Sequence, residues 1–75
     1  MNTTEYAVIL VYSTSHALRA EKVLGEADIP CKLIPVPRHL SSDCGSCIRI
    51  FQTDKDRVIP ILRAANVEMA GVHDL

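Results

Sequence analysis

The chain contains no tryptophan, and aromatic side chains make up only 4% of its 75 residues. Hydrophobic residues still account for 48% of the sequence, so the core must be built from isoleucine, leucine, valine and alanine. A chain of this length buries only about 60% of the surface that its unfolded state exposes, which predicts modest stability. The composition is typical of one small globular domain, over residues 1–75, and not of a disordered chain.

Long apolar runs and blocks of like charge are also lacking. No stretch approaches the roughly 18 continuous apolar residues of a membrane span, and residues 1–5 lack the cationic start of a signal peptide. The formal net charge is −1, with acidic and basic residues mixed along the chain. These features argue against membrane and nucleic-acid partners and predict a cytoplasmic protein.

Cysteine is scarce, with three residues, and the number is odd. In a reducing compartment such thiols are expected to be free, metal-bound or transiently oxidised, and a static disulfide framework is not expected. Cys31 begins an apolar segment after Pro30, where we expect it to act as a small buried hydrophobic residue. A catalytic, carrier or metal role for the other two cysteines therefore ranks above a structural bridge.

The order of predicted elements repeats in the two halves of the chain. The first half predicts a strand, a helix and a strand, over 6–12, 16–27 and 31–36. The second half predicts the same order, over 46–52, 56–65 and 67–73. Ser13, Thr14 or Ser15 can cap the first helix, and Thr53 or Asp54 the second. The second helix should start near Asp56, because Pro60 is tolerated only close to a first turn.

Both predicted helices end in the same way. Asp28 and Asn66 each follow an alanine and precede a β-branched residue, at positions where a left-handed conformation ends a helix. The prolines around 31–36 mark that strand as an edge strand. With right-handed crossovers, the βαββαβ order predicts a ferredoxin-like α/β sandwich, with four antiparallel strands and two helices on one face.

Alternation along the strands predicts what lies on the open face of that sheet. Cys47, Arg49 and Phe51 should share this face, because Ile48 and Ile50 point to the other one. The strand at 6–12 is apolar on both faces, although helices cover only one. An exposed apolar face of this kind suggests a partner protein or a homodimer.

The loop between the halves carries the residues best suited to chemistry. Cys44 and Cys47 have CxxC spacing with Gly45 between them, and such motifs often lower the pKa of the first thiol toward neutrality. Arg38 or a protonated His39 could stabilise a Cys44 thiolate, whereas Asp43 opposes it. We interpret this loop as a site of sulfur chemistry, with no cofactor.

Three functional classes fit these residues. The first is a carrier that holds sulfur or selenium on Cys44, with Cys47 as a resolving or assisting thiol, and exchanges the cargo with donor and acceptor proteins. The second is a metal-binding module, in which Cys44 and Cys47 would supply half of a tetrahedral site. The third is a non-catalytic interaction domain, since the fold alone does not fix a function. A dithiol oxidoreductase is disfavoured because its CxxC normally begins a helix, whereas Cys47 enters a strand.

The loop also resembles a known family. Residues 35–38 (Pro-Val-Pro-Arg) and 41–45 (Ser-Ser-Asp-Cys-Gly), with a weaker block at 17–21, are similar to the small domains called putative selenium/sulfur carrier protein-like. The resemblance spans nearly the whole chain. It implies that Cys44 accepts a persulfide or selenium atom, with Arg38 and Arg49 as neighbouring family-like positions. We expect Arg38, His39 and Arg49 to bind a substrate or another anion. Cys47 is a feature that varies among relatives under this interpretation, so a single-thiol mechanism is favoured.

Overall fold

A computed structural model describes residues 5–40 and 45–75 of the protein. Strands and helices alternate in the predicted order. The first half contains β1 (Tyr6–Val11), α1 (Thr14–Glu26) and β2 (Cys31–Pro35). The second half contains β3 (Ser46–Phe51), a 3-10 turn (Gln52–Asp54), α2 (Lys55–Ala64) and β4 (Met69–Asp74).

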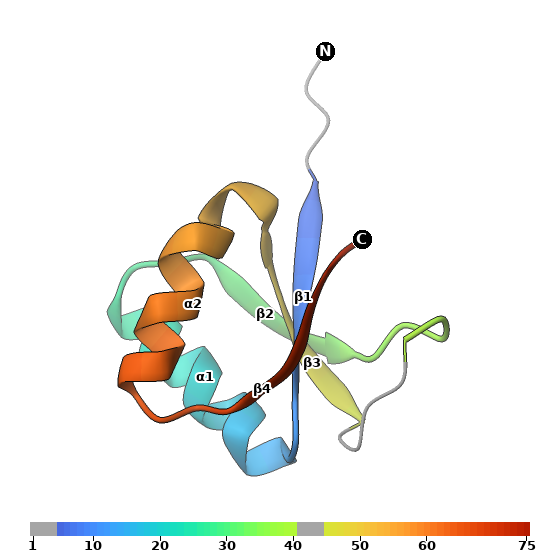
Figure 1. The fold of residues 1–75 in the computed structure, drawn as a ribbon, viewed down its shortest axis with the longest axis horizontal. Coiled ribbons are helices and arrows are strands. Elements are labelled where there is room, and N and C mark those ends of the chain that lie inside the picture. The colour runs from blue at the N-terminus through green and yellow to red at the C-terminus, as the bar shows by residue number, and fades with distance from the viewer. Residues whose placement is uncertain (1–4, 41–44) are drawn as a thin grey trace.

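The four strands form one antiparallel sheet in the order β2-β3-β1-β4. Both helices lie on the same face of this sheet (Figure 1). The structure therefore confirms the ferredoxin-like βαββαβ class, with β2 at an edge as its flanking prolines predicted. The two central strands, β1 and β3, belong to different halves of the chain, so each half is completed by the other.

The main core lies between the sheet and the two helices. Ile9, Ile48 and Ile50 point from the central strands toward α1 and α2, where Leu24 and Leu62 meet them. All five side chains are buried. Small residues let α1 approach the sheet closely, since Ala17 and Ala20 on its inner side are also fully buried. A core without tryptophan is thus filled by branched aliphatic residues at helical and strand spacing.

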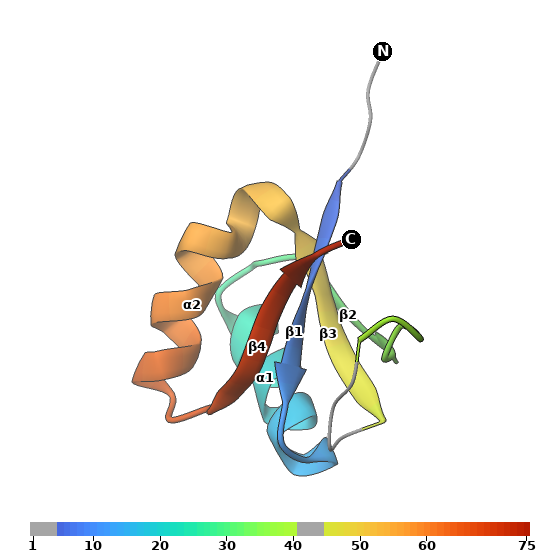
Figure 2. The same cartoon turned by 45° about the vertical axis from the view of Figure 1, so that its right-hand side comes forward.

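The opposite face of the sheet differs from the sequence-based prediction. Val8 and Cys47 are completely buried there, and Leu10 is 4% exposed. The chain that leaves β2 lies over this face, on the side away from the helices (Figure 2), and its Val36 and Leu40 pack against the three buried residues. The expectation of an exposed apolar face was wrong, because the protein covers the apolar part itself. This removes the argument for a homodimer through the open face.

The two helix ends confirm the predicted left-handed caps. Asp28 has a φ of 58° and Asn66 a φ of 60°. The N–H of Ile29 donates to the carbonyl of Leu24, and the N–H of Val67 donates to that of Leu62, at 2.9 Å in each case. These are paired Schellman motifs, in which the residue beyond the cap also buries an apolar side chain.

We expect Asn66→Val to destabilise the protein by about 1–2 kcal/mol, because a β-branched side chain clashes with the backbone at positive φ. Asn66→Gly should leave stability unchanged or raise it slightly, since glycine adopts this conformation without strain. Urea denaturation followed by circular dichroism measures both changes. Glu68→Val is the matched control, because Glu68 is exposed nearby and lacks a positive φ. Equal losses for the two valine variants would contradict the conformational explanation.

Some element boundaries differ from the predictions. The first strand ends at Val11, and Tyr12 is 49% exposed beyond it. The last strand begins at Met69, two residues later than predicted. Asp54 occupies the N-cap position of α2 but makes no capping hydrogen bond with its side chain.

Pro60 lies in the interior of α2, so its placement near the first turn was wrong. The preceding 3-10 turn lets the helix start at Lys55, one residue before the expected start. Proline removes one backbone hydrogen bond, to the carbonyl of Asp56 four residues earlier. Pro60 and Asp56 are both on the exposed side, where water can satisfy that carbonyl.

Candidate functional site

The candidate site is built around the connection between β2 and β3. Cys44, its proposed reactive residue, and the neighbouring Asp43 lie outside the described residues. Gly45, which follows Cys44 in the sequence, is exposed, and its carbonyl accepts a hydrogen bond from the N–H of Val36 at 3.2 Å. This bond extends the β2 and β3 pairing by one step beyond the Pro35 and Ser46 pair.

The sheet register locates this end of the hairpin relative to the rest of the fold. Leu10 of β1 is paired with Cys47 of β3, so the entry to β3 lies beside the end of β1. Helix α1 begins three residues after β1 ends, with the Ser13 hydroxyl accepting a hydrogen bond from the N–H of His16 at 3.3 Å. Gly45 is therefore at the end of the sheet where α1 starts. Of the three residues predicted as possible N-caps, Ser13 has this role.

Arg38 and His39 lie in a turn within the same connection. The N–H of Leu40 donates to the carbonyl of Pro37 at 3.0 Å, which closes a β-turn with Arg38 and His39 at its centre. Both side chains are exposed, while Leu40 is anchored on the apolar cluster of the open face. The turn thus presents two basic side chains to solvent and is held to the sheet by its apolar neighbours.

Cys47 is the second cysteine of the motif, and it is completely buried. Its thiol packs with Val8 and Leu10 under the covering residues, and it donates a weak, long hydrogen bond to the carbonyl of Pro35 at 3.9 Å. A protein that donates sulfur cannot reach the Cys47 sulfur unless the segment 36–40 moves. The CxxC spacing alone therefore does not make Cys47 accessible.

Arg49 is directed away from the connection. Its guanidinium carbon lies 4.2 Å from the centre of the Tyr6 ring, and Tyr6 stacks on Phe51 with the ring centres 5.4 Å apart. Tyr6 is paired with Phe51 in the register, further along β3 from Cys47 than Arg49 itself. Arg49 was predicted, like Arg38 and His39, to bind a substrate or another anion, and in the structure its guanidinium lies over the Tyr6 ring.

Sequence reasoning missed Lys32, which lies directly opposite Arg49 in the β2 and β3 pairing. Both side chains are on the open face, because Cys31 and Leu33 on either side of Lys32 pack against the helix-side core. The alternation of apolar residues along 31–36 was the signal that could have placed Lys32 there.

Cys31 is partly buried on the helix side of β2, so the prediction of a core residue holds in part. Its thiol donates to the backbone carbonyl of Glu21 in α1 at 3.9 Å. Burial, and secondarily the negative charge of Glu21, raise the pKa of the Cys31 thiol above its ordinary value of 9.0. Cys31 is therefore a poor nucleophile at neutral pH, because little of it is thiolate.

We expect the pH profile of Cys31 alkylation to have its midpoint above 9.0. The profile is measured by mass spectrometry with iodoacetamide on a Cys44→Ser, Cys47→Ala variant, in which Cys31 is the remaining thiol. Folded protein retains this proton more tightly than unfolded protein, so the associated stability is present below the unfolded pKa and is lost as the pH rises through the folded value. The same profile in urea is the control, and a midpoint at or below the unfolded value would contradict the assignment.

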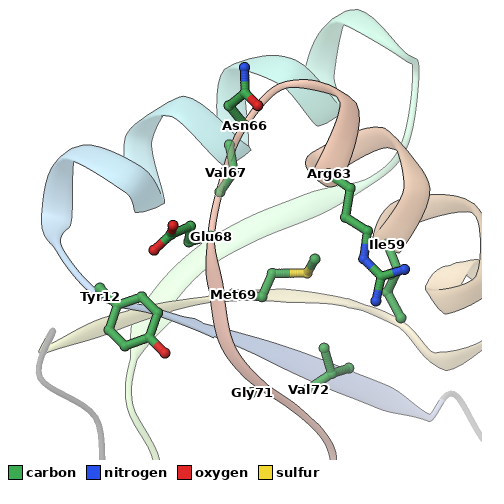
Figure 3. A pocket seen from close by; sticks show the side chains of 9 residues that line it. All are labelled: Tyr12, Ile59, Arg63, Asn66, Val67, Glu68, Met69, Gly71 and Val72. Carbon is green, nitrogen blue, oxygen red and sulfur yellow. The ribbon is translucent and has the colours of Figure 1, made fainter.

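A hollow of about 580 Å³ lies along β4 and α2. Figure 3 shows Tyr12 on one side of it and Arg63 and Ile59 of α2 on the other, with Met69 between them. Its lining contains neither cysteine nor histidine. It therefore offers no group for sulfur chemistry. Over residues 5–40 and 45–75, three or more histidine, cysteine or acidic side chains nowhere converge to hold a metal ion.

The antiparallel sheet, the two helices on one face and the cysteine-bearing connection define a ferredoxin-like α+β domain. Residues 5–74 match the family described as "Putative Se/S carrier protein-like", and the chain belongs to this family. None of the curated proteins matches the chain. In the described part of the chain, neither helix is both long and apolar enough to cross a membrane.

Proposed function

We propose that this protein carries sulfur or selenium on Cys44 and passes it from a donor protein to an acceptor protein. The observation that supports this most is the family match over residues 5–74, which has the carrier description attached to it. The cysteine spacing supports Cys44 as the residue concerned, because the next residue is a glycine, Gly45, which is exposed. A reducing compartment such as the cytoplasm suits a protein whose cysteines must act as thiols.

The proposed loading step is a thiol exchange that needs no added oxidant or reductant. The Cys44 thiolate attacks the terminal sulfur of a donor persulfide, so that a new bond forms between Cys44 and that sulfur. The sulfur–sulfur bond of the donor breaks, and the donor cysteine leaves as a thiolate. In the second step a nucleophile of the acceptor attacks the same terminal atom, and the Cys44 thiolate is released. A selenium atom in the terminal position follows the same sequence of bonds.

The surroundings of Cys31 and Cys47 disfavour both of them as the residue that holds the cargo. Cys47 is buried beneath the segment 36–40, and Cys31 has a raised pKa and is partly covered by α1. We assign the cargo to Cys44 and leave Cys47 the secondary role of a resolving thiol, which requires the covering residues to move. Arg38 and a protonated His39, both exposed on the adjacent turn, would favour the thiolate form of Cys44.

The test is intact-mass spectrometry of the anaerobic full-length protein after incubation with a cysteine desulfurase and cysteine. A mass gain of one or more sulfur atoms, reversed by a thiol reductant, is the expected result. An established sulfur carrier treated in parallel shows that the donor is active. Absence of any gain while that carrier is loaded would overturn the proposal and favour a passive interaction domain.

A further inference from the structure

We infer that the open face of the sheet contains a second site, separate from the cysteine-bearing connection, which binds a phosphate group through Lys32 and Arg49. This site does not depend on the proposed carrier function. Lys32 of β2 and Arg49 of β3 are direct partners in the antiparallel register and point to the same face. The Cβ atoms of such partners are only about 4.5–5.5 Å apart.

The pairing of two positive charges is unfavourable when nothing lies between them. In the described part of the chain, ion pairs join Lys55 to Asp74 and Arg57 to Asp54, and neither Lys32 nor Arg49 takes part in one. Asp74 belongs to the helix side of the sheet, because it is paired with Ala7 of the main core. Among residues 5–40 and 45–75, these two opposed cations therefore have no ion-pair partner, and an anionic ligand would supply the missing charge.

The arginine is held ready for such a ligand. Its guanidinium lies over the Tyr6 ring, which is itself supported by Phe51, so an otherwise flexible side chain has a preferred position. A guanidinium presents several N–H donors in a fork that matches the oxygen atoms of phosphate. Part of the ordering cost of binding is therefore removed before a ligand arrives.

The space at this position suits one small group. Tyr6, Lys32, Arg49 and Phe51 line a hollow of about 210 Å³, together with residues Pro30, Cys31 and Ile50. Sites for drug-sized ligands usually span about 300–1,000 Å³, so this hollow accommodates a phosphate and a part of its carrier. A phosphate monoester has a charge of about −1.5 to −2 at pH 7. The two positive charges of Lys32 and Arg49 therefore balance a phosphate monoester better than they would balance a single carboxylate.

His73 extends the same row of residues. The register runs from Lys32 to Arg49, then to Val8, and then to His73 of β4, all on the open face. A Cβ atom at Gly71 would lie only 3.0 Å from the Nε2 of His73, so the absence of a side chain at Gly71 gives the imidazole its room. The row contains basic or apolar residues and no acidic one, which is the charge pattern expected of a site for an anion.

The experiment is a titration of the full-length protein followed by ¹H–¹⁵N correlation spectra at constant ionic strength. Inorganic phosphate should cause saturable shifts at the amides of Lys32, Arg49 and Phe51, whereas the same ionic strength of sodium chloride should not. Lys32→Glu should weaken phosphate binding by at least roughly tenfold, because a charge-assisted contact is lost and a like charge is introduced. The same variant should unfold at a higher temperature than the wild type, because Arg49 gains an opposite charge across the strands.

Lys22→Glu is the matched control, since it makes the same charge change at an exposed position of α1. It should retain phosphate binding.

Adenosine monophosphate and adenosine separate the possible sources of the phosphate group. If adenosine monophosphate binds more tightly than inorganic phosphate, the ligand is a nucleotide, and if the two bind equally, the ligand is a small phosphate. Saturation by adenosine without any response to phosphate would overturn the inference. Shifts that do not saturate with phosphate would also overturn it, as would a loss of phosphate affinity in Lys22→Glu equal to that in Lys32→Glu. Loading of Cys44 with sulfur should be unchanged in Lys32→Glu, so failure of one proposal is distinguishable from failure of the other.

Discussion

Cys44→Ser is expected to abolish sulfur loading completely, whereas Cys47→Ala should retain most of it. Serine cannot form a persulfide, while the Cys47 thiol is buried and has no direct path to a donor. Alanine is the better replacement at Cys47, because it does not bury a hydroxyl beside Val8 and Leu10. Intact mass after treatment with desulfurase and cysteine gives the loaded fraction of each variant.

Cys31→Ala serves as the control for this pair, because it removes a thiol from the helix side of the sheet. It should load as the wild type does. Thermal unfolding of each variant shows whether the absence of a sulfur mass gain is caused by unfolding of the protein. Retention of the sulfur gain in Cys44→Ser would show that another cysteine holds the cargo. A complete loss in both Cys44→Ser and Cys47→Ala, with the fold intact, would require a dithiol mechanism in place of a single-thiol one.

Leu24→Ala should reduce the free energy of unfolding by about 2–5 kcal/mol, because the cavity is left in the centre of the main core. Leu24 is completely buried between α1 and the sheet, and its carbonyl also accepts the Ile29 hydrogen bond of the helix cap. A 75-residue domain typically has a total stability of roughly 4–11 kcal/mol. This one substitution should therefore remove a large part of the stability, as measured by urea denaturation.

The control lies in the same helix. Leu18 is 53% exposed on the outer side of α1, so Leu18→Ala should change the stability by no more than about 0.5 kcal/mol. The two substitutions delete the same atoms from the same helix and differ mainly in burial. Losses of similar size would show that helix propensity, and not core packing, dominates the stability of α1.

Local chemistry explains what could be predicted from the sequence. Asp28 and Asn66 defined both helix ends because few residues other than glycine tolerate positive φ, and the structure has that conformation at both positions. The apolar runs before Ser13 and before Gln52 predicted the central strands, because a run of this length that is rich in β-branched residues favours a β-strand. These signals depend on neighbouring residues alone, and the order of elements then fixes the topology.

What could not be predicted depends on contacts between distant segments. Burial of Val8 and Cys47 comes from Val36 and Leu40, which belong to a connection whose path no periodic pattern specifies. The position of Lys32 opposite Arg49 depends on the register between strands, which is set when they pair. Pro60 was misplaced because the 3-10 turn before α2 gives no apolar period from which to detect it.

The matching helix ends have a consequence for the architecture as a whole. Four residues separate α1 from β2 (27–30), and four separate α2 from β4 (65–68), and both stretches reverse the chain through the same backbone geometry. The domain is therefore close to a pseudo-twofold arrangement of two equivalent β-α-β modules, each delivering its last strand to one edge of the sheet. The connection over 36–45 joins these modules and belongs to neither. The pairing of the two modules constrains the residues within them, but it leaves the connection free of that constraint, and Cys44 lies in this connection while Cys47 belongs to β3.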